Sequence, residues 1–227
     1  MNRRWKLRTR PLAAALALFC ISAVTGIATA QTKTTLPGAP AADPTADLQR
    51  DSHSGLIVMA DPLTDVTRAK DIFGKANPID AGILPVQVYL RNESAQPVRV
   101  NIDTIQLVVH LLNGGRQDLD WLSAQEVAAA IAHPGGISPK QPHRIAGIPL
   151  PTGDKKADKL AEILQPLTLD GEIIAPMSTL RGYLYFDVSH ELKLANTASL
   201  YVPDVFSMPS GKPLMFFETP VGKKPAD

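Results

Sequence analysis

The sequence has very little cysteine and no surplus of charge of either sign. Its single cysteine, Cys20, lies within the first 30 of 227 residues. The rest of the chain therefore has no disulfide framework, no cysteine-ligated metal site and no cysteine nucleophile. The formal net charge is only +1, and without a basic surplus we expect no nucleic acid among the partners. The hydrophobic content of 44% excludes a wholly disordered chain.

The small net charge hides an uneven distribution. Five basic residues stand in the first ten positions, and the first acidic residue is Asp43. An apolar run from Leu12 to Ile27 follows the basic residues and leads into Ala28-Thr29-Ala30, a pattern of small residues that suits signal peptidase. We predict that residues 1–30 are a cleaved export signal, with Ala28 and Ala30 as the signal-peptidase recognition residues. The chain that remains would carry 18 basic and 22 acidic residues.

Several details of export stay open. The apolar stretch of 20 residues from Pro11 to Ala30 is about the minimum length for a spanning helix, so the signal could remain as an uncleaved anchor. A lipoprotein signal at Cys20 is disfavoured because Phe19 stands where a small residue is needed. The segment Asn2–Arg8 resembles a twin-arginine signal, apart from Lys6, and general secretion is the other route. By either route, we expect a periplasmic or extracellular protein without stable membrane insertion after cleavage.

The remaining residues predict a linker, one domain and a tail. Residues 31–53 are small, polar and rich in proline, which is typical of a flexible linker. Residues 54–219 are roughly enough for one domain that buries about two-thirds of its unfolded surface. Residues 220–227 are predicted to be a flexible tail.

Alternation of apolar and polar residues predicts about seven antiparallel strands. In 84–92, Val86, Val88 and Leu90 face one way. Between 98–102 and 105–112 the alternation slips by one residue, which predicts a bend at Asp103-Thr104 that carries the chain from one sheet to another. The other strands are expected at 55–60, 180–188, 199–206 and 213–218.

Helical spacing predicts three helices among the strands. The first, 64–73, ends at Gly74. The second, 123–132, begins with a capping box formed by Ser123 and Glu126. The third, 154–164, places four apolar residues on one stripe: Ala157, Leu160, Ala161 and Leu164. We expect residues 113–170 to be a helical insertion between strands, because this stripe is too small for a second core.

Two segments resemble extracytoplasmic immunoglobulin-like sandwich domains of bacteria. One is Val86–Asn92 (VQVYLRN), which is followed by a polar turn and Pro97-Val98, and the other is Ile174–Asp187 (IAPMSTLRGYLYFD). Together with Leu200–Asp204, they make the chain similar to an uncharacterised exported bacterial family with no assigned activity. The resemblance implies an antiparallel immunoglobulin-like β-sandwich of about seven strands, here with a helical insertion that leaves the strand order open. It carries no catalytic residue.

Patterns that carry catalytic or metal chemistry are missing. The five histidines lack zinc-binding spacing, and His133 and His143, which flank the proline-rich stretch between the second and third helices, are expected to be exposed loop residues. Asp118 and Asp120 are expected to be solvated. We also find no Gly-x-Ser-x-Gly motif and no phosphate-binding glycine loop. The sequence therefore predicts no catalytic residue, no metal site and no cofactor.

One aromatic pair remains as a candidate binding site. Tyr183 and Tyr185 share the face opposite the apolar residues of their strand, so they form either a binding patch or a surface that the helical insertion covers and buries. The leading hypothesis is an exported, non-enzymatic binding or structural module of the bacterial cell envelope. One alternative is an accessory subunit of an envelope assembly that docks on an envelope protein through 113–170, and another is an envelope hydrolase with an unrecognised site.

Overall fold

The computed structural model describes residues 43–111, 114–134 and 154–222. The predicted export signal with Ala28 and Ala30, residues 31–42 of the predicted linker, the proline-rich stretch with His143, and residues 223–227 lie outside these ranges.

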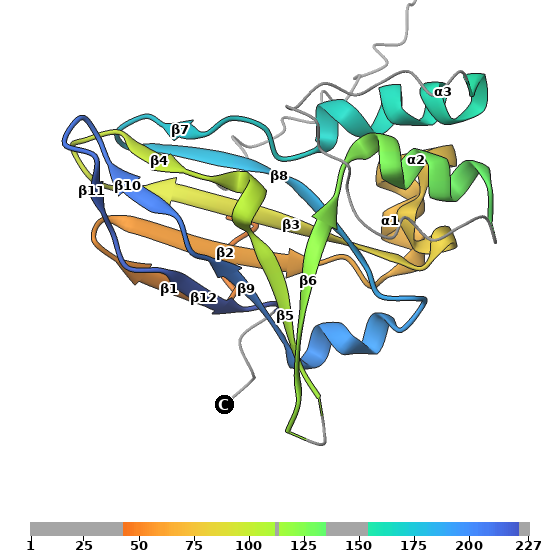
Figure 1. The fold of residues 1–227 in the computed structure, drawn as a ribbon, viewed down its shortest axis with the longest axis horizontal. Coiled ribbons are helices and arrows are strands. Elements are labelled where there is room, and N and C mark those ends of the chain that lie inside the picture. Colours follow the sequence, from red (N-terminus) through yellow and green to blue (C-terminus); the bar gives the residue numbers. More distant parts are fainter. Residues whose placement is uncertain (1–42, 112–113, 135–153, 223–227) are drawn as a thin grey trace, which may run out of the picture. The chain divides into compact units, whose positions relative to one another are not determined.

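Twelve strands, three α-helices and five short 3-10 helices make up the described ranges (Figure 1). The strands are β1 (Arg50–His53), β2 (Leu56–Pro62), β3 (Ile83–Asn92), β4 (Val98–Val100), β5 (Gln106–His110), β6 (Arg116–Leu122), β7 (Ile173–Ile174), β8 (Ser178–Asp187), β9 (Ala198–Val202), β10 (Val205–Ser207), β11 (Lys212–Pro213) and β12 (Phe217–Pro220). The helices are α1 (Val66–Phe73), α2 (Ala124–Ala132) and α3 (Lys155–Leu164), with 3-10 turns η1 (Gly74–Ala76), η2 (Pro78–Ala81), η3 (Ile102–Thr104), η4 (Gln165–Leu167) and η5 (Leu192–Thr197).

The fold is mainly β, and all paired strands are antiparallel, as the alternation predicted. One sheet has eight strands in the order β1-β2-β3-β8-β6-β5-β9-β12, and the other has four in the order β11-β10-β4-β7. The predicted number of about seven strands is too low for the described residues. β7 and β11 are only two residues long, β1 has no apolar residue, and in β6 only Leu119 and Trp121 alternate with polar residues.

The eight-stranded sheet curls until its two edge strands, β1 and β12, lie side by side (Figure 1). Side chains connect the two edges in place of a β-ladder. The His53 ring stacks on Phe217 at 3.8 Å between ring centroids, and the Thr219 hydroxyl donates to the carbonyl of Val58 on β2 at 3.3 Å. The buried side of this sheet therefore encloses one apolar interior.

The main core fills that interior and also contacts the four-stranded sheet. Val86, Val88 and Leu90 are fully buried in it, which confirms the predicted inward face of β3. The predicted bend after Ile102 is confirmed as well, because η3 joins β4 of the four-stranded sheet to β5 of the eight-stranded sheet. The Trp121 indole N–H fixes this turn by donating to the carbonyl of Ile102 at 3.0 Å.

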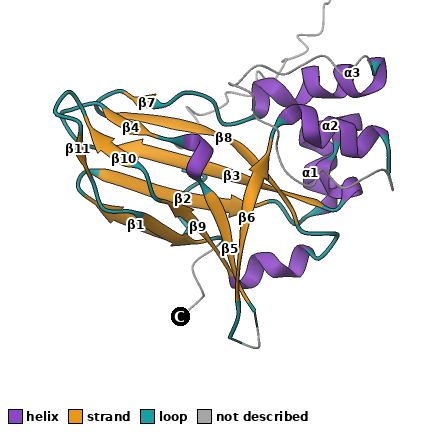
Figure 2. Ribbon diagram, viewed as in Figure 1, coloured by secondary structure: helices purple, strands orange, loops and turns teal. Residues whose placement is uncertain are grey.

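The three predicted helices are present. α2 and α3 have their predicted ends, whereas α1 ends where predicted but begins at Val66 instead of Thr64. α1 is capped by Asp65 and ends at Gly74, which has φ 57°. The capping box of Ser123 and Glu126 starts α2, and Asp154 caps α3. A side-chain oxygen at each N-cap accepts hydrogen bonds from backbone N–H groups that have no partner inside the helix. Figure 2 shows the three helices gathered at one end of the sheets.

A second core lies beneath these helices, which corrects the expected simple insertion at 113–170. All four residues of the α3 stripe are buried, as predicted, but they join Phe73 of α1 and Val127 of α2 in one apolar cluster. That cluster also includes residues from the outward face of β8. The apolar stripe of α3 is too small to form a core by itself. The three helices packed together on the sheet do form one. Residues 116–122 of the supposed insertion form β6, which joins β5 to β8.

The folded body is also longer than the predicted 54–219. Leu48 is 4% exposed and Thr45 is 7% exposed, although both fall in the predicted linker, and β1 pairs with β2. At the other end, Val221 is 8% exposed and its N–H donates to the carbonyl of Ala198. No helix in the described ranges is both long and apolar enough to cross a lipid bilayer.

Candidate functional site

Tyr183 and Tyr185 do not form an exposed patch. Tyr183 is 7% exposed and Tyr185 is fully buried, and both pack edge-on against Phe73 with centroid distances of 5.1 and 6.1 Å. Burial raises the pKa of both hydroxyl groups. The binding-patch prediction is wrong, and its alternative holds: the helices cover this face. Part of the layer that buries the two tyrosines is Phe73 of α1. Because α1 lies outside 113–170, the spacing of residues within 113–170 could not reveal this contact.

A pocket opens on the same face of the sheet, nearer the start of β8. The segment 43–49 lies over this face, and Leu48 packs against Ile57, Met59 and Tyr89. Beside it is a pocket of about 330 Å³, which we call the arginine pocket. Its lining residues are Asp43, Pro44, Thr45, Met59, Tyr89, Arg91, Thr179 and Arg181.

Strand register brings the pocket residues together. Tyr89 of β3 stands opposite Met59 of β2 on one side and Arg181 of β8 on the other. Two residues along, Arg91 stands opposite Thr179. Alternate residues of a strand share a face, so these five side chains project outward from adjacent rows of one surface.

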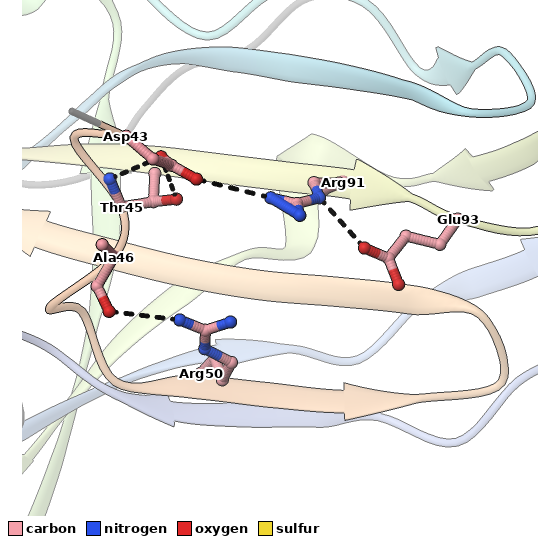
Figure 3. A network of polar contacts seen from close by, with 6 residues as sticks. All are labelled: Asp43, Thr45, Ala46, Arg50, Arg91 and Glu93. Carbon is pink, nitrogen blue, oxygen red and sulfur yellow. Dashed lines mark hydrogen bonds and ion pairs between the residues drawn. The ribbon is translucent and has the colours of Figure 1, made fainter. Parts of the chain in front are cut away.

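Arg91 is held by two carboxylates at one end of the pocket (Figure 3). Its Nε donates to Glu93 Oε1 at 3.1 Å, and its Nη1 lies 3.8 Å from Asp43 Oδ2. Asp43 Oδ1 in turn accepts hydrogen bonds from the Thr45 hydroxyl at 2.7 Å and the Thr45 N–H at 2.9 Å. These two bonds, with a smaller contribution from Arg91, lower the pKa of Asp43. Arg50 donates to the Ala46 carbonyl and fixes the same turn.

The other end of the pocket has donors without partners. Arg181 is exposed, and within the described ranges no carboxylate lies within ion-pair distance of it. Burial raises the pKa of Tyr89, with nearby charges as smaller influences, so its hydroxyl is neutral at physiological pH. Among the same residues, nothing forms a hydrogen bond with that hydroxyl. A guanidinium fork and a neutral hydroxyl therefore line this end of the pocket.

This arrangement is suited to binding rather than to bond cleavage. The lining holds no serine, cysteine, histidine or lysine, and the proton acceptor beside a threonine hydroxyl is the Asp43 carboxylate, which accepts from Thr45. The only carboxylate, Asp43, has a lowered pKa, which is unfavourable for a general acid or base near neutral pH. In the described part of the chain, no group of three His, Cys, Asp or Glu side chains could hold a metal ion.

None of the four histidines in the described ranges belongs to the pocket lining. His133 is exposed, as predicted, and its Nε2 contacts Asp154 Oδ2, which joins the end of α2 to the start of α3. His110 is exposed and lies 3.7 Å from Glu218. Sequence reasoning placed Tyr89 and Arg91 on the outward face of β3 but gave no sign of a pocket. Arg181 joins the pocket only because β3 pairs with β8. The other side of the pocket comes from segment 43–49, which the sequence predicted to be part of the linker.

Comparisons with known proteins add little to this geometry. No family model matches the chain, and no curated protein matches it. The chain is structurally similar to a functionally unknown protein from Listeria monocytogenes EGD-e, with a TM-score of 0.34 and 13% sequence identity. The match covers 77% of this chain and 82% of the Listeria chain.

Proposed function

We propose that this protein is an exported, non-enzymatic binding module of the bacterial cell envelope, and that it binds its ligand in the arginine pocket. The observation that carries the proposal is the pocket itself, in which Arg181 and the Tyr89 hydroxyl line one end with no partner in the described residues. Binding sites commonly combine a concave surface with a few polar groups that fix the ligand's orientation. The predicted export signal supports the location.

The make-up of the pocket favours binding over a purely structural role. An exposed arginine adds little to stability, because even an exposed ion pair contributes only about 0–1 kcal/mol. Arg91 is paired in this way, whereas Arg181 is not. Met59 and Pro44 supply apolar contact beside these polar groups.

Co-purification from the native envelope tests the proposal. Tagged wild-type protein is compared with Arg181→Glu, and Arg99→Glu serves as the matched control because Arg99 is an exposed arginine of β4 outside the pocket. We expect Arg181→Glu to lose the molecules that wild type and Arg99→Glu retain. Equal recovery by all three proteins would contradict pocket binding. A measured turnover that vanished on changing one polar residue would contradict the non-enzymatic assignment.

We propose docking through 113–170 as a second role, in which the protein is an accessory subunit of an envelope assembly. The supporting observation is that the start of α3 is tied to the end of α2: His133 contacts Asp154, and Lys156 Nζ donates to the Ala132 carbonyl at 3.0 Å. The end of α2 and the start of α3, which flank this stretch in the sequence, thus lie at one place. Deletion of residues 134–152 should abolish recovery of a partner that the Arg181→Glu protein still binds.

We further propose that the two sheets are an elaborated immunoglobulin-like sandwich of the exported bacterial family that the sequence resembles. The change of sheet between β4 and β5 supports this reading, because sandwich strands can switch sheets at a bend. An experimental structure with the strand order of a different β fold would contradict it.

A further inference from the structure

We infer that the arginine pocket takes a carboxylate, from a small organic acid or from the C-terminus of a peptide, and that Arg181 and the Tyr89 hydroxyl hold it. The inference deepens the proposed binding function and rests on it. It assigns a ligand class to the end of the pocket where no protein carboxylate is bound.

The first step concerns the charges around the pocket. Arg91 faces two carboxylates, those of Asp43 and Glu93. Arg181 faces none within ion-pair distance among the described residues, so its guanidinium has no ion-pair partner there. A single guanidinium without an ion-pair partner suits a ligand that carries one negative charge. A planar guanidinium can bind both oxygens of a carboxylate through two parallel hydrogen bonds.

The second step uses Asp43, which already places a carboxylate in the pocket. This group lies 3.8 Å from Arg91, and its main hydrogen bonds go to Thr45. The Arg91 end is therefore occupied by the protein's own anion, and a ligand carboxylate is left with the Arg181 end. The Asp43 charge also disfavours a phosphate group, because phosphate carries more negative charge near neutral pH than a carboxylate does.

The third step concerns the rest of the ligand. The pocket volume of about 330 Å³ lies at the lower end of the range for small-molecule sites. Met59 and Pro44 give the lining an apolar portion, while Thr179 and Thr45 offer hydroxyl groups. A short acid with a small apolar group fits this combination of space and surface.

The test measures binding to the purified full chain by calorimetry and by NMR shifts of the Arg181 and Tyr89 signals. The ligands are N-acetyl-alanylalanine with a free C-terminus, the same peptide amidated, propionate and inorganic phosphate. We expect the free peptide to bind at least 10-fold more tightly than the amidated peptide. Binding of propionate as well would identify small acids in general, and binding of the free peptide alone would identify a chain terminus. Tighter binding of phosphate than of either carboxylate, or no binding of any carboxylate, would overturn the inference.

Variants then connect the binding to the named residues. Arg181→Gln should weaken carboxylate binding at least 10-fold, and Arg181→Lys should weaken it less, because lysine keeps the charge without the fork. Asp43→Asn should strengthen it several-fold, because it removes the competing charge while the amide oxygen can still accept from Thr45. Arg99→Gln is the control and should change nothing. An Asp43→Asn protein with unchanged or weaker affinity would contradict the inference.

Failure of the ligand class can be told apart from failure of the proposed function. If Arg181→Glu loses its co-purified molecules but no carboxylate binds the purified protein, the pocket binds a ligand of another class. If Arg181→Glu retains those molecules and no carboxylate binds, both the inference and the binding function fail.

Discussion

Asp51 and Glu218 lie 167 residues apart in the sequence and are joined by one hydrogen bond, in which Asp51 Oδ2 accepts the Glu218 N–H at 3.0 Å. Asp51 belongs to β1 and Glu218 to β12, the two edges of the eight-stranded sheet. Next to this bond, His53 Nε2 lies 3.1 Å from the carbonyl oxygen of Phe216. Side chains of β1 thus form hydrogen bonds with backbone groups of β12 and of the residue before it. At an exposed sheet edge these backbone groups would have no partner in the protein.

Removal of the Asp51 carboxylate should loosen this closure. We expect Asp51→Ala to lower the free energy of unfolding by about 1 kcal/mol, because the Glu218 N–H loses its acceptor. Asp51→Asn should cost less, since its amide oxygen can still accept. Asp118→Ala is the control: Asp118 pairs with Arg116 at the surface, and such pairs are worth at most about 1 kcal/mol and often much less. Urea unfolding measures all three. Equal losses for Asp51→Ala and Asp118→Ala would show that other contacts close the sheet.

Asn92 should be among the residues most sensitive to substitution. It is fully buried at the end of β3, and its Nδ2 lies within 2.8 to 3.2 Å of the carbonyl oxygens of Gln96, Ile174 and Ala175. Its Oδ1 accepts from the N–H and hydroxyl of Ser94. We expect Asn92→Ala to lower the free energy of unfolding by at least about 2 kcal/mol, because several buried polar groups lose their partners together.

The matched control for Asn92 is Asn101→Ala. Asn101 is half-exposed, and its side chain makes no capping bond to the turn that follows it. A change within about 0.5 kcal/mol is expected there, as for most surface substitutions. Urea midpoints for the two variants that differ by no more than this would contradict the role of Asn92 in joining the β3 end to β7.

The predictable part of the fold is the part in which neighbouring residues decide the structure. The alternation of Val86, Val88 and Leu90 reflects a strand with one face in the core, and it predicted β3 correctly. The capping box of Ser123 and Glu126 predicted the start of α2, because its hydrogen bonds form within one helical turn.

The unpredictable part depends on contacts between distant segments. In 213–218 the alternation put Leu214 and Phe216 opposite Met215 and Phe217 without showing which face is buried. Phe217 is fully buried and Phe216 is 48% exposed, but Met215, on the same predicted face as Phe217, is 69% exposed. β12 begins only at Phe217, where pairing with β9 starts. The arginine pocket was missed for the same reason: Arg181 reaches Tyr89 through strand register, 92 residues later in the chain.

Gly182 should not tolerate a side chain. A Cβ atom at this position would lie 2.4 Å from the Cα of Leu169, and the preceding residue, Thr168, forms a parallel bridge with Tyr183 of β8. The Leu169 N–H donates to the Tyr183 carbonyl at 2.9 Å, so moving this segment away from β8 would break a backbone hydrogen bond. We expect Gly182→Ala to cost about 3 kcal/mol or more, at the upper end for overpacking. In Gly211→Ala the new Cβ meets nothing within 4 Å but φ is +66°, so only about 1 kcal/mol of backbone strain is expected. Similar thermal shifts for both would contradict the collision.

The Tyr185 hydroxyl should be dispensable. It is buried without a hydrogen-bond partner in the described residues. Thr168 lies near enough to lower its pKa a little, but the Thr168 hydroxyl donates to the Leu164 carbonyl, and burial raises the Tyr185 pKa overall. We expect Tyr185→Phe to be neutral or to stabilise the protein by up to about 1 kcal/mol, because an unpaired polar group leaves the core. Tyr185→Ala is the contrast, with a loss of about 3–5 kcal/mol for a large buried side chain. A clear loss in Tyr185→Phe would reveal a partner for the hydroxyl.

Asp43 should titrate below the usual aspartate pKa of about 3.9. Hydrogen bonds from the Thr45 hydroxyl and N–H lower its pKa most, and the Arg91 charge contributes less. Because the folded pKa is depressed, the stability that Asp43 contributes is present above its unfolded pKa and is lost as the pH falls through the folded value. At mildly acidic pH Asp43 is therefore still charged, and it keeps its place beside Arg91.

Carboxyl-carbon NMR titration can separate the two causes of this shift. Thr45→Val removes the hydroxyl donor, which lies 2.7 Å from Asp43, and leaves the N–H donor in place. The Asp43 pKa should rise in this variant but stay below the usual value. Arg91→Gln removes a charge at 3.8 Å and should raise the pKa less than Thr45→Val does. If Arg91→Gln had the larger effect, the ion pair would be the main force that holds segment 43–49 on the sheet, and neutralising Asp43 would release that segment from the pocket. With Thr45 as the larger influence, Asp43 is instead kept in place by hydrogen bonds within its own turn, and we expect a ligand carboxylate to bind at Arg181 without displacing it.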